Sequence, residues 1–305
     1  MEASVIIPTY NGAEKILQIL ENLSLQTFND FEIIIGIDGS TDDTENIIET
    51  QKNIDKRRII VFKQKNKGRS VIRNNTAKLA KTDLLIFYDD DVQPAPNSVE
   101  KHILFHQKNE STILAAKIAE KYDNLNVDFL KFREYLTKKW IGNYGNGITE
   151  LTRENLFLSA ANFSISKQLF FVLNGFDEYL RDAEDWDFAI NAVENHIKIF
   201  FDADNIVWHN DPLTCREYII RQRQYKENHE LLAKTKPDLY RLYNERLIAP
   251  KQSILRKLVY LILANKWSVK QVDNNFYTFL PQSIRYKLYD IVITGLSHIS
   301  PNKKI

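Results

Sequence analysis

Three consecutive carboxylates, Asp89, Asp90 and Asp91, follow directly after the apolar residues 84–87. Like charges this close repel one another, and each loses hydration where the chain is buried. Two carboxylates spaced by one residue at the end of a strand can hold a hard divalent cation, with phosphate oxygens completing its shell. Asp89 and Asp91 have that spacing, so the triplet predicts a metal and diphosphate site. The alternative is a solvated turn that leads into a helix.

A second acidic group, Glu184, Asp185 and Asp187, opens a predicted helix that reaches to about residue 195. The helix dipole favours anions in the first turn, so capping explains part of this pattern. A carboxylate here could also take a proton from a hydroxyl nucleophile as a general base. Trp186 either belongs to the core or stacks on a sugar ring.

Several other residues allow a structural or a functional interpretation. Asp38, in Asp38-Gly39-Ser40, could form a turn with an N-cap or accept a hydrogen bond from a nucleobase N–H. Arg69 and Arg73 share one helical face and suit either phosphate binding or solvent. His209 could be structural or could be a third ligand of an ion at Asp91.

His102 and His106 lie one helical turn apart, and a metal role for them competes with a structural one.

The elements that must position these residues alternate along the first half of the chain. Strand-like segments cover residues 3–8, 31–38, 59–63 and 84–89, and helical segments cover 12–25, 42–51 and 69–81. This alternation predicts a parallel α/β sheet. Ligands of such sheets bind beyond the carboxyl ends of the strands, where the Asp triplet lies.

The remaining sequence predicts a strand at 111–119, a helix at 167–173 and a strand at 197–202. Cys215 is the one cysteine of the 305 residues, so no disulfide forms within the chain and a reducing, cytoplasmic compartment is expected. We expect no secretory signal, because no basic n-region and h-region precede the first apolar run. We expect no transmembrane segment, because the longest apolar run, residues 258–264, is too short to span a bilayer.

Charge divides the chain unevenly. Residues 231–305 contain 13 Lys and Arg against 4 Asp and Glu, which leaves 28 and 36 of the totals of 41 and 40 for residues 1–230. Ile254, Leu258, Leu261 and Ile262 predict an amphipathic helix in this basic segment. It could contact an anionic membrane surface, pack on the domain or form a dimer contact. Nothing resembles a nucleic-acid-binding module, so no nucleic acid is expected as a partner.

Seven short motifs stand in a fixed order along residues 3–210. They are Pro8-Thr9-Tyr10-Asn11, Asp38-Gly39-Ser40, Asn66-x-Gly68-x4-Arg73-Asn74, Asp89-x-Asp91, Gly175-Phe176-Asp177-Glu178, Glu184-Asp185 and His209. This order resembles family 2 of the inverting glycosyltransferases. The resemblance implies a GT-A fold, a Rossmann-like and mostly parallel sheet flanked by helices. We expect a catalytic domain at 1–230, with a nucleotide-sugar half at about 1–110 and an acceptor half at 111–230, and a basic helical extension at 231–305.

The resemblance also implies roles for individual residues. The donor nucleotide would be bound by Pro8, Thr9, Tyr10, Asn11, Asp38, Gly68, Arg73, Asp89 and Asp90. Asp89 and Asp91 would hold Mn²⁺ or Mg²⁺ in a DxD motif, and His209 would complete the metal shell. Asp185 would be the catalytic base, with Glu184 and Trp186 on the acceptor side.

The chain departs from the family at two positions. Ile37 stands where many members have a first acid, and Asn191 stands where many have an arginine. A Gln-x-x-Arg-Trp motif is absent, which favours a single-addition enzyme over a processive synthase. The expected donor is a UDP-sugar by default, and the expected acceptor is a glycan or a lipid-linked hydroxyl in bacterial surface-glycan assembly, with a possible peripheral location at the inner face of the membrane.

Two other functions compete with this interpretation. A sugar-phosphate nucleotidyltransferase would have a Gly-rich, basic loop after the first strand, which residues 8–12 do not provide. An inactive nucleotide-sugar binding module or scaffold is the second alternative, and the presence of Asp185 argues against it.

Overall fold

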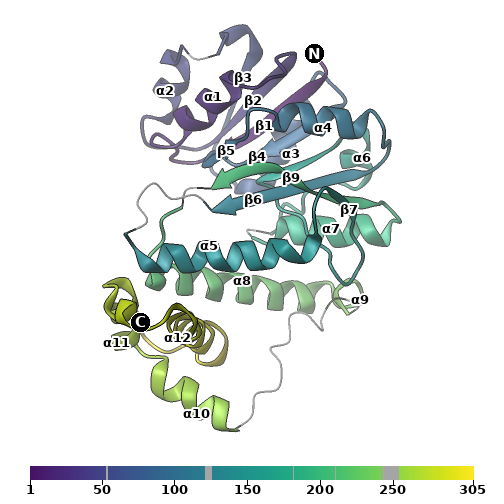
Figure 1. The fold of residues 1–305 in the computed structure, drawn as a ribbon. Helices are drawn as coiled ribbons and strands as arrows, with labels where there is room; N and C mark the ends of the chain where they lie inside the picture. The colour runs from purple at the N-terminus through teal and green to yellow at the C-terminus, as the bar shows by residue number, and fades with distance from the viewer. Residues whose placement is uncertain (53, 121–125, 181, 210, 242, 244–253) are drawn as a thin grey trace. The chain divides into compact units, whose positions relative to one another are not determined.

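The computed structural model describes residues 1–52, 54–120, 126–180, 182–209, 211–241, 243 and 254–305 (Figure 1). The chain divides into two compact units. Unit 1 contains residues 1–119 and 141–210, and unit 2 contains residues 120–140 and 211–305. The division near residue 210 differs from the boundary at 230 that the sequence led us to expect, because residue 230 lies within a helix of unit 2.

Unit 1 is built around a mixed sheet that has nine strands among the described residues. The strands are β1 (Ala3–Thr9), β2 (Phe31–Asp38), β3 (Ile59–Gln64), β4 (Leu84–Tyr88), β5 (Val92–Pro94), β6 (Ile113–Glu120), β7 (Ile148–Glu150), β8 (Asn162–Ser166) and β9 (Ile199–His209). Their order is β3-β2-β1-β4-β8-β6-β9-β5, with β7 paired to β9. Strands β3, β2, β1 and β4 are parallel, as predicted. Beyond β4 the pairs β4–β8, β6–β8, β5–β9 and β7–β9 are antiparallel.

Helices cover both faces of the parallel strands (Figure 1). They are α1 (Ile16–Ser24), α2 (Thr44–Thr50), α3 (Arg69–Leu79), α4 (Ser98–His106), α6 (Lys167–Val172) and α7 (Glu184–Glu194). Every residue of β2 is buried, as expected of a strand with helices on both sides. Apolar side chains of α1, α2 and α4 share one core with alternate residues of β1 and β2, such as Val5 and Ile33. On the other face, α3 packs on β1 and β2 where Gly36 leaves room; a Cβ there would lie 2.5 Å from Ile72.

A cluster of phenylalanines holds α7 against the sheet. Phe87 of β4 stacks on Phe163 of β8 at 4.6 Å between ring centroids. Phe176 contacts Phe87 at 5.8 Å and Phe188 of α7 at 5.3 Å. Because Phe188 lies in α7, these contacts fix the helix that begins with the predicted acidic residues.

Strand β9 is longer than the sequence predicted. The expected strand ended at residue 202, whereas β9 continues to His209. Residues 200–202 of β9 pair with β7, and its last three residues pair with β5. The second pairing sets Val92 opposite His209, and this register brings the end of the Asp triplet to the predicted metal ligand.

The two histidines of α4 belong to a buried polar network. His102 contacts Ser164 Oγ at 2.7 Å through Nδ1 and Asn162 Oδ1 at 3.0 Å through Nε2. His106 Nε2 contacts the same Ser164 hydroxyl at 2.9 Å. Burial lowers the pKa of His102 to about 3 and that of His106 to about 4. These contacts agree with the structural interpretation of the pair.

Unit 2 is helical. Its elements are α5 (Asp128–Ile141, whose last residue belongs to unit 1), α8 (Cys215–Thr235), α9 (Pro237–Tyr240), α10 (Ile254–Leu263), α11 (Lys266–Asp273), the short helix η4 (Phe276–Phe279), α12 (Gln282–Thr294) and η5 (Gly295–Ile299). Its core joins α5 to α8, α11 and α12 through residues such as Phe129, Ile219 and Tyr289. No helix within the described ranges has the length and apolarity needed to cross a membrane. In the predicted amphipathic helix, the side chains of residues 254–257 lie outside the described part.

Candidate active site

The first two carboxylates of the triplet have separate partners. Asp89 Oδ1 accepts a hydrogen bond from Arg73 at 2.5 Å, and Asp90 Oδ2 accepts one from the Thr9 hydroxyl at 2.6 Å. Burial raises the pKa of Asp90 to about 6, although the Thr9 hydroxyl acts in the opposite direction. A Cβ on Gly12 would lie 2.2 Å from Thr9 Oγ1 and 2.6 Å from Asp90 Oδ2, so only glycine fits beside this hydrogen bond. Thr9 therefore holds Asp90.

The third carboxylate, Asp91, lies between two basic side chains. Its oxygens are 3.3 Å from His209 Nε2 and 3.4 Å from Lys15 Nζ. Burial alone would raise the pKa of Asp91, but His209 and Lys15 together hold it below its ordinary value. Asp91 is therefore a carboxylate at neutral pH. Lys15 was not predicted, because it lies 76 residues from Asp91 in a segment without a recognisable motif.

Two side chains at this edge of the sheet are of types that could serve as ligands of a divalent ion. Within the described ranges, no three His, Cys, Asp or Glu side chains are grouped so that they could hold a metal ion by themselves. Asp91 and His209 supply a carboxylate and an imidazole side by side, whereas Asp89 faces Arg73. Mg²⁺ is typically bound by one or two protein groups together with phosphate oxygens and water. The arrangement suits an ion that arrives with a diphosphate.

Arg73 and Glu184 lie behind the site. Arg73 is 2% exposed, and its guanidinium bridges Glu184 Oε1 and Asp89 Oδ1, each at 2.5 Å. Burial would lower the pKa of Arg73, but the two carboxylates raise it above its ordinary value. The sequence predicts Arg73 at the nucleotide and Glu184 at the acceptor. In the structure each is 2% exposed and buried against the other, so each presents little surface to a ligand.

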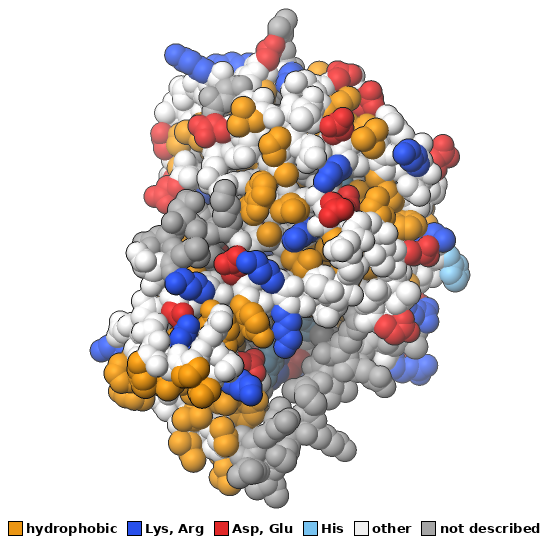
Figure 2. All heavy atoms as spheres, viewed as in Figure 1, with side chains coloured by type: hydrophobic (Ala, Val, Ile, Leu, Met, Phe, Trp, Pro, Cys, Tyr) orange, Lys and Arg blue, Asp and Glu red, His pale blue; other side chains and the backbone are white. Residues whose placement is uncertain are grey.

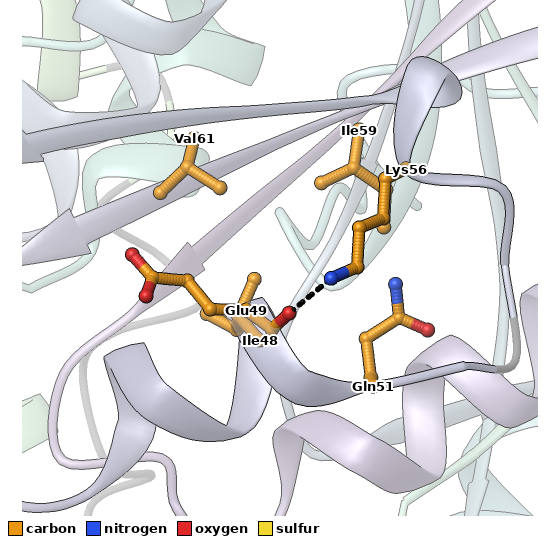
Figure 3. Close-up of a pocket in the computed structure, with 6 residues that line it drawn as sticks. All are labelled: Ile48, Glu49, Gln51, Lys56, Ile59 and Val61. Carbon is orange, nitrogen blue, oxygen red and sulfur yellow. Dashed lines mark hydrogen bonds between the residues drawn. The ribbon is translucent and has the colours of Figure 1, made fainter.

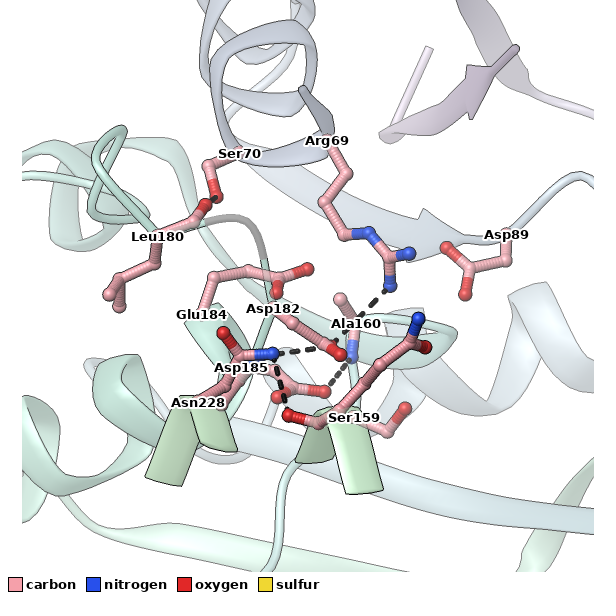
Figure 4. A network of polar contacts seen from close by, with 12 residues as sticks. Arg69, Ser70, Asp89, Ser159, Ala160, Leu180, Asp182, Glu184, Asp185 and Asn228 are labelled. Atoms are coloured by element: carbon pink, nitrogen blue, oxygen red, sulfur yellow. Dashed lines mark hydrogen bonds and ion pairs between the residues drawn. The ribbon is translucent and has the colours of Figure 1, made fainter. Parts of the chain in front are cut away.

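Asp185 is held by backbone donors at the start of α7. Its Oδ1 accepts a hydrogen bond from Trp186 N at 2.7 Å. Its Oδ2 accepts one from Ala160 N at 3.4 Å (Figure 4). Burial raises the pKa of Asp185 to about 7, and the neighbouring charge of Glu184 adds to this effect. The side chain remains partly exposed. A reachable carboxylate that titrates near neutral pH is suited to general base catalysis. The contact from Ala160 N–H to Asp185 was not predicted, because no sequence motif marks Ala160.

The segment before α7 is tied to α3. Asn74 donates to the Phe176 carbonyl at 2.8 Å and accepts from Phe176 N at 3.0 Å. Ser70 donates to the Leu180 carbonyl at 3.0 Å (Figure 4). Gly175 has a φ of 63°, and a Cβ there would lie 2.7 Å from Asn74 Oδ1. These contacts join the motif at 66–74 to the motif at 175–178.

Asp38 anchors the loop that leads into α3. Its Oδ1 accepts hydrogen bonds from Gln64 Nε2 at 2.7 Å and from Lys67 N at 2.9 Å. Its Oδ2 accepts one from Gly68 N at 2.8 Å. Only 4% of Asp38 is exposed, so the predicted contact with a nucleobase would have to use a remaining lone pair of this carboxylate. Gln64 was not predicted, although it is opposite Asp38 in the β2–β3 register.

The loops after β1 and β2 are joined beside Tyr10. Asn11 N donates to Ser40 Oγ at 3.0 Å, and Asn11 Oδ1 accepts from Thr41 N at 2.8 Å. Asn11 has a φ of 49°, a conformation that asparagine tolerates better than most residues. Pro8 is half-buried, whereas 53% of Tyr10 is exposed. The Tyr10 ring is therefore presented at the carboxyl ends of the strands, where a base could stack on it.

A separate hollow of about 400 Å³ lies between α2 and β3 (Figure 3). It is lined by Ile48, Glu49, Gln51, Lys56, Ile59 and Val61. The Lys56 side chain crosses the hollow, and its Nζ donates to the Glu49 carbonyl at 2.6 Å. None of the predicted site residues lines it.

Comparison with known proteins gives one family. The family model described as Glycosyl transferase family 2 matches residues 4–172. An uncharacterized glycosyltransferase, YfnE of Bacillus subtilis, is 36% identical over 115 residues, which is 37% of this chain and 29% of that protein. An uncharacterized glycosyltransferase of Haemophilus influenzae is 26% identical over 63% of this chain and 62% of its own length. The chain thus spans less than two thirds of these relatives.

A wider match is to the O-antigen chain rhamnosyltransferase RfbN of Salmonella typhimurium, which is 24% identical over 71% of this chain and 69% of its own. Among solved structures, residues 1–349 of S. aureus TarS superpose with a TM-score of 0.55 at 20% identity, covering 99% of this chain and 92% of that one. The same protein in complex with UDP-GlcNAc gives 0.55 at 19% identity, covering 99% and 93%.

Proposed function

Because the chain belongs to glycosyl transferase family 2 and has the predicted GT-A fold, we propose that it is an inverting glycosyltransferase. It moves a sugar from a nucleotide-sugar, by default a UDP-sugar, to an acceptor hydroxyl. The observation that carries this proposal is Asp185, a partly exposed carboxylate oriented by two backbone N–H groups at the carboxyl-end edge of the sheet. Burial there raises its pKa.

The geometry of Asp185 suits proton removal. The N–H groups of Trp186 and Ala160 orient the carboxylate and leave its other lone pairs for an acceptor hydroxyl. As Asp185 takes the proton, the acceptor oxygen forms a bond to the anomeric carbon, and the bond from that carbon to the diphosphate breaks. One in-line displacement of this kind inverts the anomeric configuration. Trp186 would line the acceptor side.

Asp91 and His209 would hold Mn²⁺ or Mg²⁺, which when bound would neutralise charge on the diphosphate. Lys15 adds a positive charge beside Asp91. Asp89 and Arg73 link this edge to Glu184, the residue before the base, so the donor and acceptor sides share one buried arginine.

Similar proteins support the choice of substrates. Structures of TarS are described as complexes with UDP and with UDP-GlcNAc, which supports a nucleotide-sugar donor for this chain. Two relatives are named O-antigen chain rhamnosyltransferases, which supports a role in surface-glycan assembly and a glycan or lipid-linked acceptor. The positive charge of residues 231–305 supports a peripheral location at the inner face of a membrane.

A panel of UDP-, GDP- and dTDP-sugars tests this function through release of the nucleoside diphosphate. We expect release from at least one donor, and a loss of about a hundredfold to ten-thousandfold in Asp185→Asn. Glu194→Gln is the matched control and should keep full activity, since Glu194 lies at the far end of α7 from Asp185, beside the half-exposed Arg153. Nucleotide-sugar binding without turnover by the unmodified chain would instead indicate an inactive binding module.

A further inference from the structure

An exposed apolar surface lies on unit 2 (Figure 2). We call it the apolar face, and it is formed by Leu258, Leu261, Ile262, Trp267, Phe276 and Phe279. Each of these side chains is between 49% and 71% exposed. Contiguous exposed patches of large apolar side chains are rare on soluble proteins and mark interaction sites.

Helix α10 contributes an exposed stripe to this face while its other side is already packed. Leu258, Leu261 and Ile262 have the spacing of one helical face and are exposed. Tyr260 of α10 is partly buried, and a Cβ on Gly295 of η5 would lie 3.2 Å from its ring. The helix therefore already buries one side in unit 2, and the exposed stripe remains available to a partner.

Three aromatic rings continue the face. Trp267 and Phe276 lie 6.5 Å apart between centroids, and Phe276 and Phe279 lie 5.8 Å apart. The inner side of α11 is buried through Val269 and Val272. The three rings contact one another at the surface and not in the core. They are therefore placed to enter an apolar environment outside the protein.

The charges around the face are positive. Lys266 and Lys270 are exposed on α11, on either side of Trp267 in the sequence. Residues 258–305 contain six Lys and Arg, two Asp and no Glu. One of those two aspartates, Asp273, is turned inward and accepts a hydrogen bond from Cys215 N at 2.6 Å. A partner that matches this surface has an apolar region and negative charges next to it.

We infer that the apolar face docks the protein on an anionic lipid bilayer. Trp267, Phe276 and Phe279 enter the headgroup region, where aromatic rings are favoured, and Lys266 and Lys270 contact lipid phosphates. A second copy of the chain suits the face less well, because a two-fold interface would bring the same positive charges together. The inference rests on the membrane location proposed above and names the surface that makes the contact. It uses no catalytic residue, so it holds or fails independently of the proposed reaction.

The test is co-sedimentation of the full chain, without nucleotide, with vesicles of phosphatidylcholine alone or mixed with phosphatidylglycerol. We expect binding only to the anionic vesicles and release at high salt. Lys266→Gln with Lys270→Gln should weaken binding about thirtyfold, because each lysine near an anionic surface strengthens binding by about fivefold. Trp267→Ser with Phe279→Ser should weaken it at unchanged net charge.

A matched control comes from unit 1. Val172 and Tyr179 are 68% and 96% exposed there, and Val172→Ser with Tyr179→Ser should bind vesicles as the unmodified chain does. The inference is overturned if the full chain binds no anionic vesicles, or if the Trp267 and Phe279 variant binds them equally well. It is also overturned if that variant converts a dimer to a monomer in analytical ultracentrifugation, which would assign the face to a second copy.

Discussion

Glu184 and Asp185 are adjacent in sequence but have different surroundings. Glu184 is 2% exposed and paired with Arg73, whereas Asp185 is partly exposed and has backbone N–H donors. The buried charge of Glu184 adds to the effect of burial in raising the pKa of Asp185 to about 7. The acidic pair thus provides one structural carboxylate and one carboxylate that can exchange a proton at neutral pH.

The pKa of Asp185 predicts the pH dependence of the reaction. Only the deprotonated carboxylate can accept a proton, so kcat/KM should be level above about pH 7 and fall about tenfold per pH unit below it. The measurement is kcat/KM against pH for the unmodified chain and for Glu194→Gln, which should share one profile. A rate that stays constant down to about pH 5 would show that Asp185 is not the base.

Arg73 should be important for stability. Arg73→Gln leaves Glu184 and Asp89 without their cation, and removing one partner of a buried ion pair costs about 3–5 kcal/mol. Arg69 is the control, since it lies one turn earlier on α3, is half exposed and is 3.8 Å from Asp182. Arg69→Gln should change the free energy of unfolding by less than about 1 kcal/mol. Equal effects of the two substitutions in urea unfolding would refute the bridging role of Arg73.

At the scale of elements, sequence patterns predicted those parts whose burial is determined locally. The strands β1, β2, β3 and β4 were predicted because each is an apolar run between helices. Strands β5 and β7 have three residues each and exist only through pairing with β9, so no periodicity reveals them. The helix α5 was also missed; its buried side is completed by residues more than 80 positions later.

The same distinction holds for the candidate site. The triplet 89–91 and Asp185 could be found because their types and order match a family. The pairing of Arg73 with Glu184 and the contact of Lys15 with Asp91 could not, since the first two residues are 111 positions apart and the other two are 76 apart. Such pairs arise from the strand order and from the packing of α3 against the segment before α7.

The histidines of α4 should make the fold sensitive to acid. Burial lowers the pKa of His102 from 6.5 to about 3, so the unfolded chain binds its proton first as the pH falls. The contribution of His102 to the free energy of unfolding is therefore complete above pH 6.5 and decreases below it. At about pH 5 this loss amounts to about 2 kcal/mol. The measurement is urea unfolding at neutral pH and at about pH 5. The free energy of unfolding should fall between these pH values by about 2 kcal/mol less for His102→Gln than for the unmodified chain.

His196 is exposed, so His196→Gln is the matched control and should behave as the unmodified chain does. An identical acid loss in His102→Gln and in the unmodified chain would contradict this account of the network.

At the scale of the whole molecule, the basic segment is not an independent appendage. Unit 2 combines residues 120–140 from the middle of the chain with residues 211–305. Asp128 of α5 accepts hydrogen bonds from Arg285 at 2.9 Å and from the Tyr289 hydroxyl at 2.8 Å. Phe129 and Phe132 are buried against α12 residues. The core of unit 2 therefore combines residues from between the two segments of unit 1 with residues that follow both segments.

A truncation to residues 1–230 should consequently damage the protein. It would expose Phe129 and Phe132 and leave Asp128 without its partners. We expect low soluble yield and a lower unfolding temperature than for the full chain, measured by thermal denaturation. A truncated protein that is as soluble and as heat-stable as the full chain would show that residues 231–305 fold separately.

Calorimetric titration of UDP, followed by GDP and dTDP, tests the donor site most directly. It is done with Mn²⁺ or with a chelator, on the unmodified chain, on Asp91→Asn and on Asp30→Asn, a control at an exposed carboxylate. We predict that one nucleotide binds in the presence of the metal and that binding is lost with chelator and in Asp91→Asn but kept in Asp30→Asn. Failure of all three nucleotides to bind, or binding that is indifferent to the metal and to Asp91, would contradict the account.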